Sequence, residues 1–351
     1  MENLYGVTQN EMKQILTGWG QPAFRGDQLF SWVQGRQVDS FDRMGNLPGP
    51  VRERLLASYS LYLPGVVRMQ SSRASDTQKA LLQLEDGLTV ETVLMSYRRR
   101  DARNRNTVCV SSQVGCAMGC PFCATGQGGL MRSLTAAEIV GQVIRMHKVL
   151  QEDRPQDKVT NVVFMGMGEP LHNYDAVVRA IRLLGDPGGL NIGARRITVS
   201  TCGLVPGIRR LAREGLAVTL AVSLHSAVNE TRDRLVPVNR TWPLDELMDA
   251  CREYFDLTGR RLTFEYALIA GENDRTGDAR DLGKLLRGLN AQVNLIPLNP
   301  IREGSYRRST QALDFVRLLK EQNVEAVIRE EMGADIDAAC GQLNGTHKEM
   351  E

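Results

Sequence analysis

The sequence is poor in aromatic residues and has no long apolar run. Phe, Trp and Tyr together make up 5% of its 351 residues, so recognition of a partner by many stacked aromatic rings is not an obvious mode. No apolar run reaches the length of about 18 residues that a membrane-spanning helix needs, so we expect no membrane span. The first residues mix charges with apolar side chains and lack a secretory core, so the expected location is the cytoplasm.

An excess of charge of either sign is also missing. The 43 Lys and Arg residues are nearly balanced by 41 Asp and Glu residues, and the net charge of +2 indicates no particular partner. The distribution is less even, because five arginines fall between Arg98 and Arg105. Such a run is either a solvated loop or a phosphate-binding segment, and the sequence leaves both open.

Seven cysteines in a cytoplasmic chain indicate metal or redox chemistry rather than a disulfide framework. Cys116, Cys120 and Cys123 have the spacing C-x3-C-x2-C. Structural zinc normally takes four ligands, and no histidine lies nearby. An iron–sulfur cluster held by three thiolates would leave one iron open to a substrate, and Gly115 and Gly119 would let the backbone approach it closely. We therefore favour a cluster over zinc or a disulfide.

Two patterns divide the chain. Residues 1–75 predict a small helical unit, which either binds nucleic acid or packs on the rest, and residues 76–105 contain a β-hairpin over 78–95 and the basic run. In residues 106–351, short β-rich runs alternate with helical runs, which predicts an α/β domain with a parallel sheet. Periodicity does not separate a partly closed barrel from a doubly wound sheet. The predicted strands are 107–111, 159–165, 196–200, 217–224, 261–269, 292–298 and 324–329. The predicted helices are 11–17, 23–33, 50–56, 136–150, 175–184, 206–213, 244–257, 277–289 and 310–322.

The motif CAMGCPFC resembles the signature of the radical S-adenosylmethionine (SAM) enzymes. Further motifs, in the order CVSSQVGC, FMGMGEP, STCGLVPGIRRL, SLH, VNLIPLNP and DIDAACGQL, resemble the RlmN/Cfr family of radical SAM RNA methyltransferases over nearly the whole chain. Pro170 and Pro297 are more similar to the RlmN branch than to the Cfr branch. The resemblance implies a partial (β/α)6 barrel with a small helical accessory domain.

The resemblance also implies an activity. Carbon 2 of adenine is electron-poor and does not attack a methyl cation equivalent, so in this family a radical delivers the methyl group. The implied substrates are adenosines in 23S rRNA and in the anticodon loop of tRNAs. The implied cofactors are a [4Fe–4S] cluster and two SAM molecules per turnover, with an electron donor such as flavodoxin or ferredoxin, and we expect a monomer. Methylation at carbon 8, as in the Cfr branch, and a non-catalytic Fe–S RNA-binding protein are the alternatives.

Residue roles follow from the resemblance at matching positions. Cys340 corresponds to the cysteine that carries the methyl group, and Cys109 to the cysteine that resolves the adduct; without the resemblance they are a tail cysteine and a buried strand thiol. Glu91 corresponds to the base, although a strand glutamate is most often exposed to solvent. Cys202 and Cys251 match no role and are expected to be structural. The implied cluster ligands are Cys116, Cys120 and Cys123, and the implied SAM contacts are Gly168, Glu169, Ser200, Ser223, Leu224, His225 and Asn299.

Overall fold

One sheet of ten strands forms the centre of the computed structural model, which describes residues 1–74, 76–98, 104–301 and 304–345. Its strand order is β14-β13-β12-β11-β10-β9-β6-β5-β4-β3. In chain order these strands are β3 (Gly65–Ser71), β4 (Thr77–Gln83), β5 (Thr89–Tyr97), β6 (Arg105–Cys109), β9 (Asn161–Phe164), β10 (Ile197–Thr201), β11 (Thr219–Ser223), β12 (Leu262–Leu268), β13 (Ala291–Pro297) and β14 (Glu325–Ile328).

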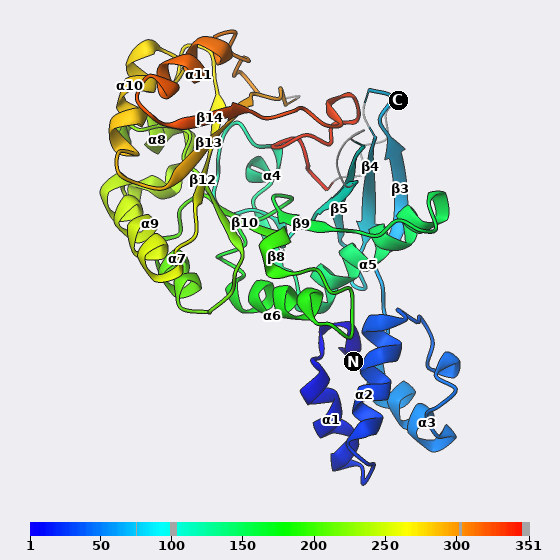
Figure 1. Ribbon diagram of the computed structural model, residues 1–351. Coiled ribbons are helices and arrows are strands. Elements are labelled where there is room, and N and C mark those ends of the chain that lie inside the picture. The colour runs from blue at the N-terminus through cyan, green and yellow to red at the C-terminus, as the bar shows by residue number, and fades with distance from the viewer. Residues whose placement is uncertain (75, 99–103, 302–303, 346–351) are drawn as a thin grey trace.

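The parallel part of the sheet runs from β6 to β14, and each strand pairs with the strand of this sheet that follows it along the chain. A doubly wound sheet reverses its strand order at a switch point, whereas this order never reverses. The winding is therefore that of a barrel. Because β14 and β3 form the two edges of the sheet, the barrel is partial, as the resemblance implied, and Figure 1 shows its helices on the outer side.

The predicted hairpin exists and belongs to the same sheet. β4 and β5 are antiparallel partners, and β5 continues the sheet by pairing with β6, so that Val93 lies opposite Cys109. The sequence did not predict β3, which pairs with the other edge of β4 and has exposed Val66 and Val67. The domain boundaries at 75/76 and 105/106 stay predictions.

Helices connect the parallel strands where the periodicity predicted them. Thr135 and Glu138 form the capping box that was expected at the start of α5. Two short helices were not predicted, α4 (Ala124–Gln127) and α8 (Asn229–Leu235). The remaining helices of this part are α5 (Ala136–Asp153), α6 (Tyr174–Gly185), α7 (Val205–Ala212), α9 (Leu244–Thr258), α10 (Thr276–Leu285) and α11 (Ala312–Lys320).

The N-terminal helices are α1 (Gln9–Gly18), α2 (Phe24–Phe30) and α3 (Gly49–Ser58), and Figure 1 shows them in blue beneath the barrel. Their buried residues, such as Leu16, Leu29 and Leu55, belong to the same apolar cluster as the barrel core. The contact with the barrel includes a hydrogen bond from Arg179 Nε to Gly6 O at 2.6 Å. Among the described residues, no helix is long and apolar enough to cross a membrane.

Candidate active site

A cavity with about 950 Å³ of empty space opens at the carboxyl ends of the parallel strands. Parallel α/β barrels bind their ligands at this end, because the strand ends bring loops from the whole sheet together. Most of the site residues expected from the sequence meet here. The cavity is lined by Cys116, Cys120, Cys123, Gly168, Glu169, Ser200, Ser223, His225, Asn299 and Cys340.

The cysteine loop, residues 116–123, extends from a short hairpin of β7 (Gln113–Gly115) and β8 (Leu130–Ser133). Gly115 has a φ of +78°, and a Cβ atom there would lie 1.9 Å from Gly129 O. Cys116 N donates a hydrogen bond to the same oxygen at 2.8 Å. Only glycine therefore fits at the entrance of the loop, and α4 begins directly after Cys123.

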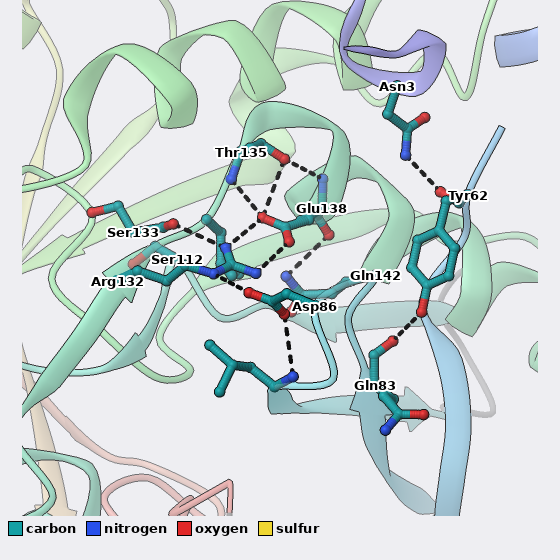
Figure 2. A network of polar contacts seen from close by, with 12 residues as sticks. Asn3, Tyr62, Gln83, Asp86, Ser112, Arg132, Ser133, Thr135, Glu138 and Gln142 are labelled. Atoms are coloured by element: carbon teal, nitrogen blue, oxygen red, sulfur yellow. Dashed lines mark hydrogen bonds and ion pairs between the residues drawn. The ribbon is translucent and has the colours of Figure 1, made fainter. Parts of the chain in front are cut away.

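Arg132 on β8 joins the cysteine loop to two other elements (Figure 2). It donates to Asp86 Oδ2, in the turn between β4 and β5, at 2.7 Å. It also donates to both carboxylate oxygens of Glu138, at 2.9 and 2.7 Å. One partly buried cation thus fixes the loop relative to the hairpin and to the start of α5.

The three thiols of the loop lie close enough to affect one another. Burial raises the pKa of Cys116 to about 11, and the charges of Glu169 and Cys123 add to the effect. Burial also raises the pKa of Cys120, and Cys123 and Cys116 contribute. These thiols therefore favour their neutral form until a metal stabilises the thiolates.

The donor set fits an iron–sulfur cluster better than a single ion. Within the described part of the chain, no group of three His, Cys, Asp or Glu side chains is placed to hold one metal ion. A four-iron cluster makes a different demand, because each cysteine binds a different iron. Three separated thiols on one wall of the cavity meet that demand.

Gly168 and Glu169 follow β9. A Cβ atom at Gly168, which has a φ of +98°, would lie 2.5 Å from Gln113 Cβ, so the close approach requires glycine. Glu169 is buried, and its two oxygens accept hydrogen bonds from Leu171 N at 2.9 Å and Cys202 N at 2.8 Å. Burial raises the pKa of Glu169. A carboxylate fixed in this way is suited to accept from the ammonium group of an amino acid.

His225 follows β11 and has a φ of +57°. This left-handed conformation is held by hydrogen bonds from Asn273 Nδ2 to His225 O at 2.7 Å and from Ala267 N to His225 Nδ1 at 2.9 Å. Burial lowers the pKa of His225 to about 3, and the Arg232 charge contributes. The ring is therefore neutral with its proton on Nε2, and it packs edge-on against Phe122 of the cysteine loop.

The buried oxygen Asn299 Oδ1 in the cavity wall has no hydrogen-bond partner among the described residues. An unsatisfied buried acceptor costs free energy, so this oxygen is suited to receive a donor from a polar ligand such as SAM. Glu265 Oε2 also lacks a hydrogen bond there, but it lies 3.6 Å from Arg329 Nη1 and forms an ion pair with it. Leu224 differs from the other expected SAM contacts, because its side chain is fully buried in the core and does not line the cavity.

A second cavity, with about 570 Å³ of empty space, adjoins the first. Cys109 lines only the second cavity, whereas Cys340 and Arg329 line both. Burial raises the pKa of Cys109 to about 12; Cys340 adds to the shift and Arg329 opposes it. All seven cysteines lie in the described residues, and all are free thiols. The two cysteines expected to react thus meet in one cavity.

The segment that carries Cys340 follows β14 and runs in red toward β5 in Figure 1. It is hydrogen-bonded to the helix that follows the cysteine loop. Ala124 N donates to Gly341 O at 2.8 Å, and Thr125 Oγ1 donates to Leu343 O at 2.5 Å. The tail is therefore attached to α4.

Glu91 on β5 is covered by the same tail. Its Oε1 lies 2.9 Å from Lys79 Nζ, and its Oε2 accepts from Asn344 N at 2.7 Å and Gly345 N at 3.1 Å. The general expectation of an exposed strand glutamate is wrong here, because Glu91 is buried. It lines neither cavity, and the tail amides cover one of its two oxygens in this arrangement.

Several residues of the two cavities were not predicted. Cys202, which was expected to be structural, lines the first cavity, as do Glu265 and Arg329. Arg329 could have been found from its position as the final residue of the last predicted strand, since the carboxyl ends of parallel strands form the ligand-binding end of such a sheet. Glu265 lies within β12, and its position in the sequence did not indicate that it would line a cavity. Cys251 is buried in α9 as expected.

The basic run is only partly described. Arg98 forms an ion pair with Asp157 at 2.7 Å, and Arg105 stacks on the Tyr97 ring at 3.9 Å. Arg99, Arg100 and Arg103 lie outside the described residues. In the described part of the run, Arg98 therefore forms an ion pair within the protein, and Arg105 lies beside Tyr97, which lines the second cavity.

Two family models match the chain. The model of the radical SAM superfamily matches residues 110–282, and the model of the ribosomal RNA large subunit methyltransferase N-terminal domain matches residues 2–60. The first match covers the barrel from the residue after β6 into α10 but not β13 and β14, and the second covers the N-terminal helices.

Similar proteins cover the whole chain. A probable dual-specificity RNA methyltransferase RlmN from Moorella thermoacetica is 50% identical over 99% of this chain and 98% of its own length. A protein of the same description from Symbiobacterium thermophilum is 49% identical over 97% of this chain and 90% of its own length. The crystal structure of a radical SAM methyltransferase from Sphaerobacter thermophilus is 46% identical and superimposes with a TM-score of 0.92 over 99% of this chain and 100% of that chain.

Proposed function

The chain belongs to the RlmN family of radical SAM RNA methyltransferases, and we propose that it methylates carbon 2 of adenosine in 23S rRNA and in the anticodon loop of tRNAs. The position of Cys340 is the main support. It lies on the wall between a cavity with three cluster-type thiols and a cavity that contains Cys109. A methyl group that passes from SAM to a carbon atom through a cysteine needs this arrangement.

The family implies SAM and a [4Fe–4S] cluster. Cys116, Cys120 and Cys123 would hold the cluster, and Glu169 and Asn299 would bind the polar groups of SAM. When bound, the two cofactors supply a radical that can abstract hydrogen from an unactivated methyl group. We propose two SAM molecules per turnover, one as the methyl source and one for the radical, and flavodoxin or ferredoxin as the electron donor.

Two cysteines divide the transfer between them. Cys340 Sγ accepts the methyl group, this methyl group loses a hydrogen atom to the radical, and the resulting methylene carbon adds to carbon 2 of adenine. The adduct then gives up one electron, which the cluster would take back, and the proton of carbon 2. Cys109 Sγ attacks Cys340 Sγ to form a disulfide, the bond between Cys340 Sγ and the methylene carbon breaks, and that carbon takes up a proton to become the methyl group of the released base. Arg329, which lines both cavities, favours the thiolate form of Cys109.

We propose that the second cavity opens further to receive an extruded base. Apolar side chains of Met95, Met165 and Met332 form part of its wall, and Asn299 and Arg329 add polar groups. An enzyme that acts on a base takes it out of the stack into a pocket of this kind. Glu91 would then take the proton from carbon 2. Since ribosomes and tRNAs are the proposed substrates, we infer a cytoplasmic location, and we propose that the enzyme acts as a monomer.

Mass spectrometry of nucleosides tests the proposal. The reconstituted protein is incubated with rRNA or tRNA, a reductant and methyl-labelled SAM, and the adenosines are analysed. Labelled 2-methyladenosine is the expected product. Labelled 8-methyladenosine would assign the Cfr-type reaction instead. A protein that contains its full amount of iron but neither cleaves SAM nor methylates RNA would favour the non-catalytic Fe–S protein.

A further inference from the structure

Lys79 is a buried lysine that contacts both the expected base and the tail. Its side chain lies on β4 and is 6% exposed. Nζ lies 2.9 Å from Glu91 Oε1 and donates to Asp337 O at 3.0 Å. Because Leu81 lies opposite Glu91 in the sheet, Lys79 and Glu91 project from the same face. One ammonium group therefore joins the carboxylate to the segment that carries Cys340.

We propose that Lys79 is a positioning residue that keeps the Glu91 carboxylate aimed at the substrate while the tail moves aside. This inference rests on the proposed function, because it assigns Glu91 the proton of carbon 2. In that step the C–H bond at carbon 2 of the adduct breaks, the proton passes to a Glu91 oxygen, and the electron pair stays on the purine.

Two backbone amides of the tail cover the Glu91 carboxylate, so the tail has to move before Glu91 can reach the adenine. Glu91 Oε2 accepts from Asn344 N and Gly345 N, and Thr89 Oγ1 donates to Gly345 O at 2.5 Å. Residues 344 and 345 therefore cover the carboxylate that has to approach the adenine. Two backbone N–H groups therefore occupy this oxygen as long as the tail stays in place.

The residues that line the second cavity show which space Glu91 would face if the tail residues that cover it moved away. Side chains alternate along a strand, so Glu91 shares its face of β5 with Met95 and Tyr97, which line the second cavity. Leu343, directly before the covering amides, lines the same cavity. Withdrawal of residues 344 and 345 would therefore connect Glu91 with the pocket proposed for adenine, and among the described residues the carboxylate would keep its contact with Lys79.

The substitution Lys79→Met tests this role against a purely structural one. We expect K79M to keep its iron and its SAM cleavage, to lose methylated adenosine by at least tenfold, and to accumulate RNA bound covalently to Cys340, because addition precedes proton removal. K79R, which keeps the cation, should restore product and remove the adduct. K148M is the matched control: Lys148 is a half-buried lysine that donates to Gln37 O at 2.9 Å, away from both cavities, and its product yield should match the wild type.

The outcomes separate this inference from the proposed function. A wild-type protein that makes no methylated adenosine contradicts the proposed function. A wild-type protein that methylates, together with a K79M variant that makes normal product or that loses product without any adduct, contradicts the role of Lys79.

Hydrogen exchange of the wild-type protein provides a second measurement that needs no variant. The amides of Asn344 and Gly345 should exchange at least several-fold faster when substrate RNA is bound, because they leave Glu91. Unchanged or slower exchange in the RNA complex would contradict the uncovering of the base.

Discussion

Cys109 and Cys340 line one cavity, although one ends a central strand and the other lies in the tail. The sheet fixes Cys109 rigidly between its partners Val93 and Val163. Cys340 lies outside any strand or helix, and its carbonyl oxygen accepts a hydrogen bond at 3.2 Å from Nδ2 of Asn299, which follows β13. The rigid thiol is therefore suited to resolve an adduct, and the looser one to carry it.

Replacing either cysteine should stop turnover at a different stage. C109A should accumulate a covalent adduct between Cys340 and RNA, because addition can occur but the sulfur that releases the product is missing. C340A should give no adduct and still cleave SAM. Denaturing gel electrophoresis with labelled RNA distinguishes these outcomes, and an adduct in C340A would assign the carrier to another residue.

The iron content of cysteine-to-alanine variants should distinguish the proposed cluster ligands from the other cysteines. C116A, C120A and C123A should each lose most of the brown colour and the approximately four irons expected per reconstituted chain. C251A is the matched control, since Cys251 is fully buried in α9 and its truncation should cost about 1 kcal/mol of stability through a small cavity. Equal iron in C120A and C251A would contradict the assigned ligand set.

Release of the product should accelerate as the pH rises. Burial raises the pKa of Cys109 to about 12, so at neutral pH only a small fraction is the thiolate that attacks. Below that value the thiolate fraction grows about tenfold per pH unit. Single-turnover decay of the adduct between pH 7 and pH 9 measures this slope, and a rate independent of pH would show that Cys109 deprotonation does not limit the step.

Because His225 is neutral, SAM binding, unlike product release, should not depend on pH in this range. Burial lowers the pKa of His225 to about 3, so the ring stays neutral throughout the range from pH 5 to pH 8. SAM affinity, measured by calorimetry under anaerobic conditions, should therefore show no transition near the usual histidine pKa of about 6.5. A transition there that disappears in H225N would contradict the neutral ring.

Gly115→Ala should disrupt the cysteine loop far more than an ordinary glycine substitution. The new Cβ atom would lie 1.9 Å from Gly129 O, so the hairpin that closes the loop has to open and iron retention should fall severalfold. G259A is the control, since Gly259 also has a positive φ of 63° and has open space around it. It should cost about 1 kcal/mol of stability and no iron.

Local sequence patterns account for the parts of the fold that were predicted well. The alternation of strands and helices, the capping box at Thr135 and the cysteine spacing all depend on residues close together in sequence. The strand β3 has a weak pattern because Val66 and Val67 are both exposed, and it gains its place by pairing with β4. Whether the parallel sheet forms a partial barrel or a doubly wound sheet depends on the order of its strands. The periodicity of the sequence does not give this order.

Long-range contacts explain what the sequence did not predict. The pair of Lys79 and Glu91 is covered by tail residues that lie more than 250 positions away, and no local pattern indicates such a partner. Leu224 was expected at the site because the motif SLH resembles the family there, but its side chain is buried in the core and does not line the first cavity. Cys202 looked structural by its type, yet its position after β10 brings it to the first cavity.

The hydrogen bonds from Ala124 and Thr125 to the tail have a thermodynamic consequence. Both donors closely follow Cys123, the proposed cluster ligand, so a loop ordered by bound iron would also order the segment of Cys340. Coupling of this kind is reciprocal: whatever free energy the cluster contributes to docking of the tail, docking of the tail contributes to retention of the cluster. Loss of iron and release of the methyl carrier are therefore linked equilibria.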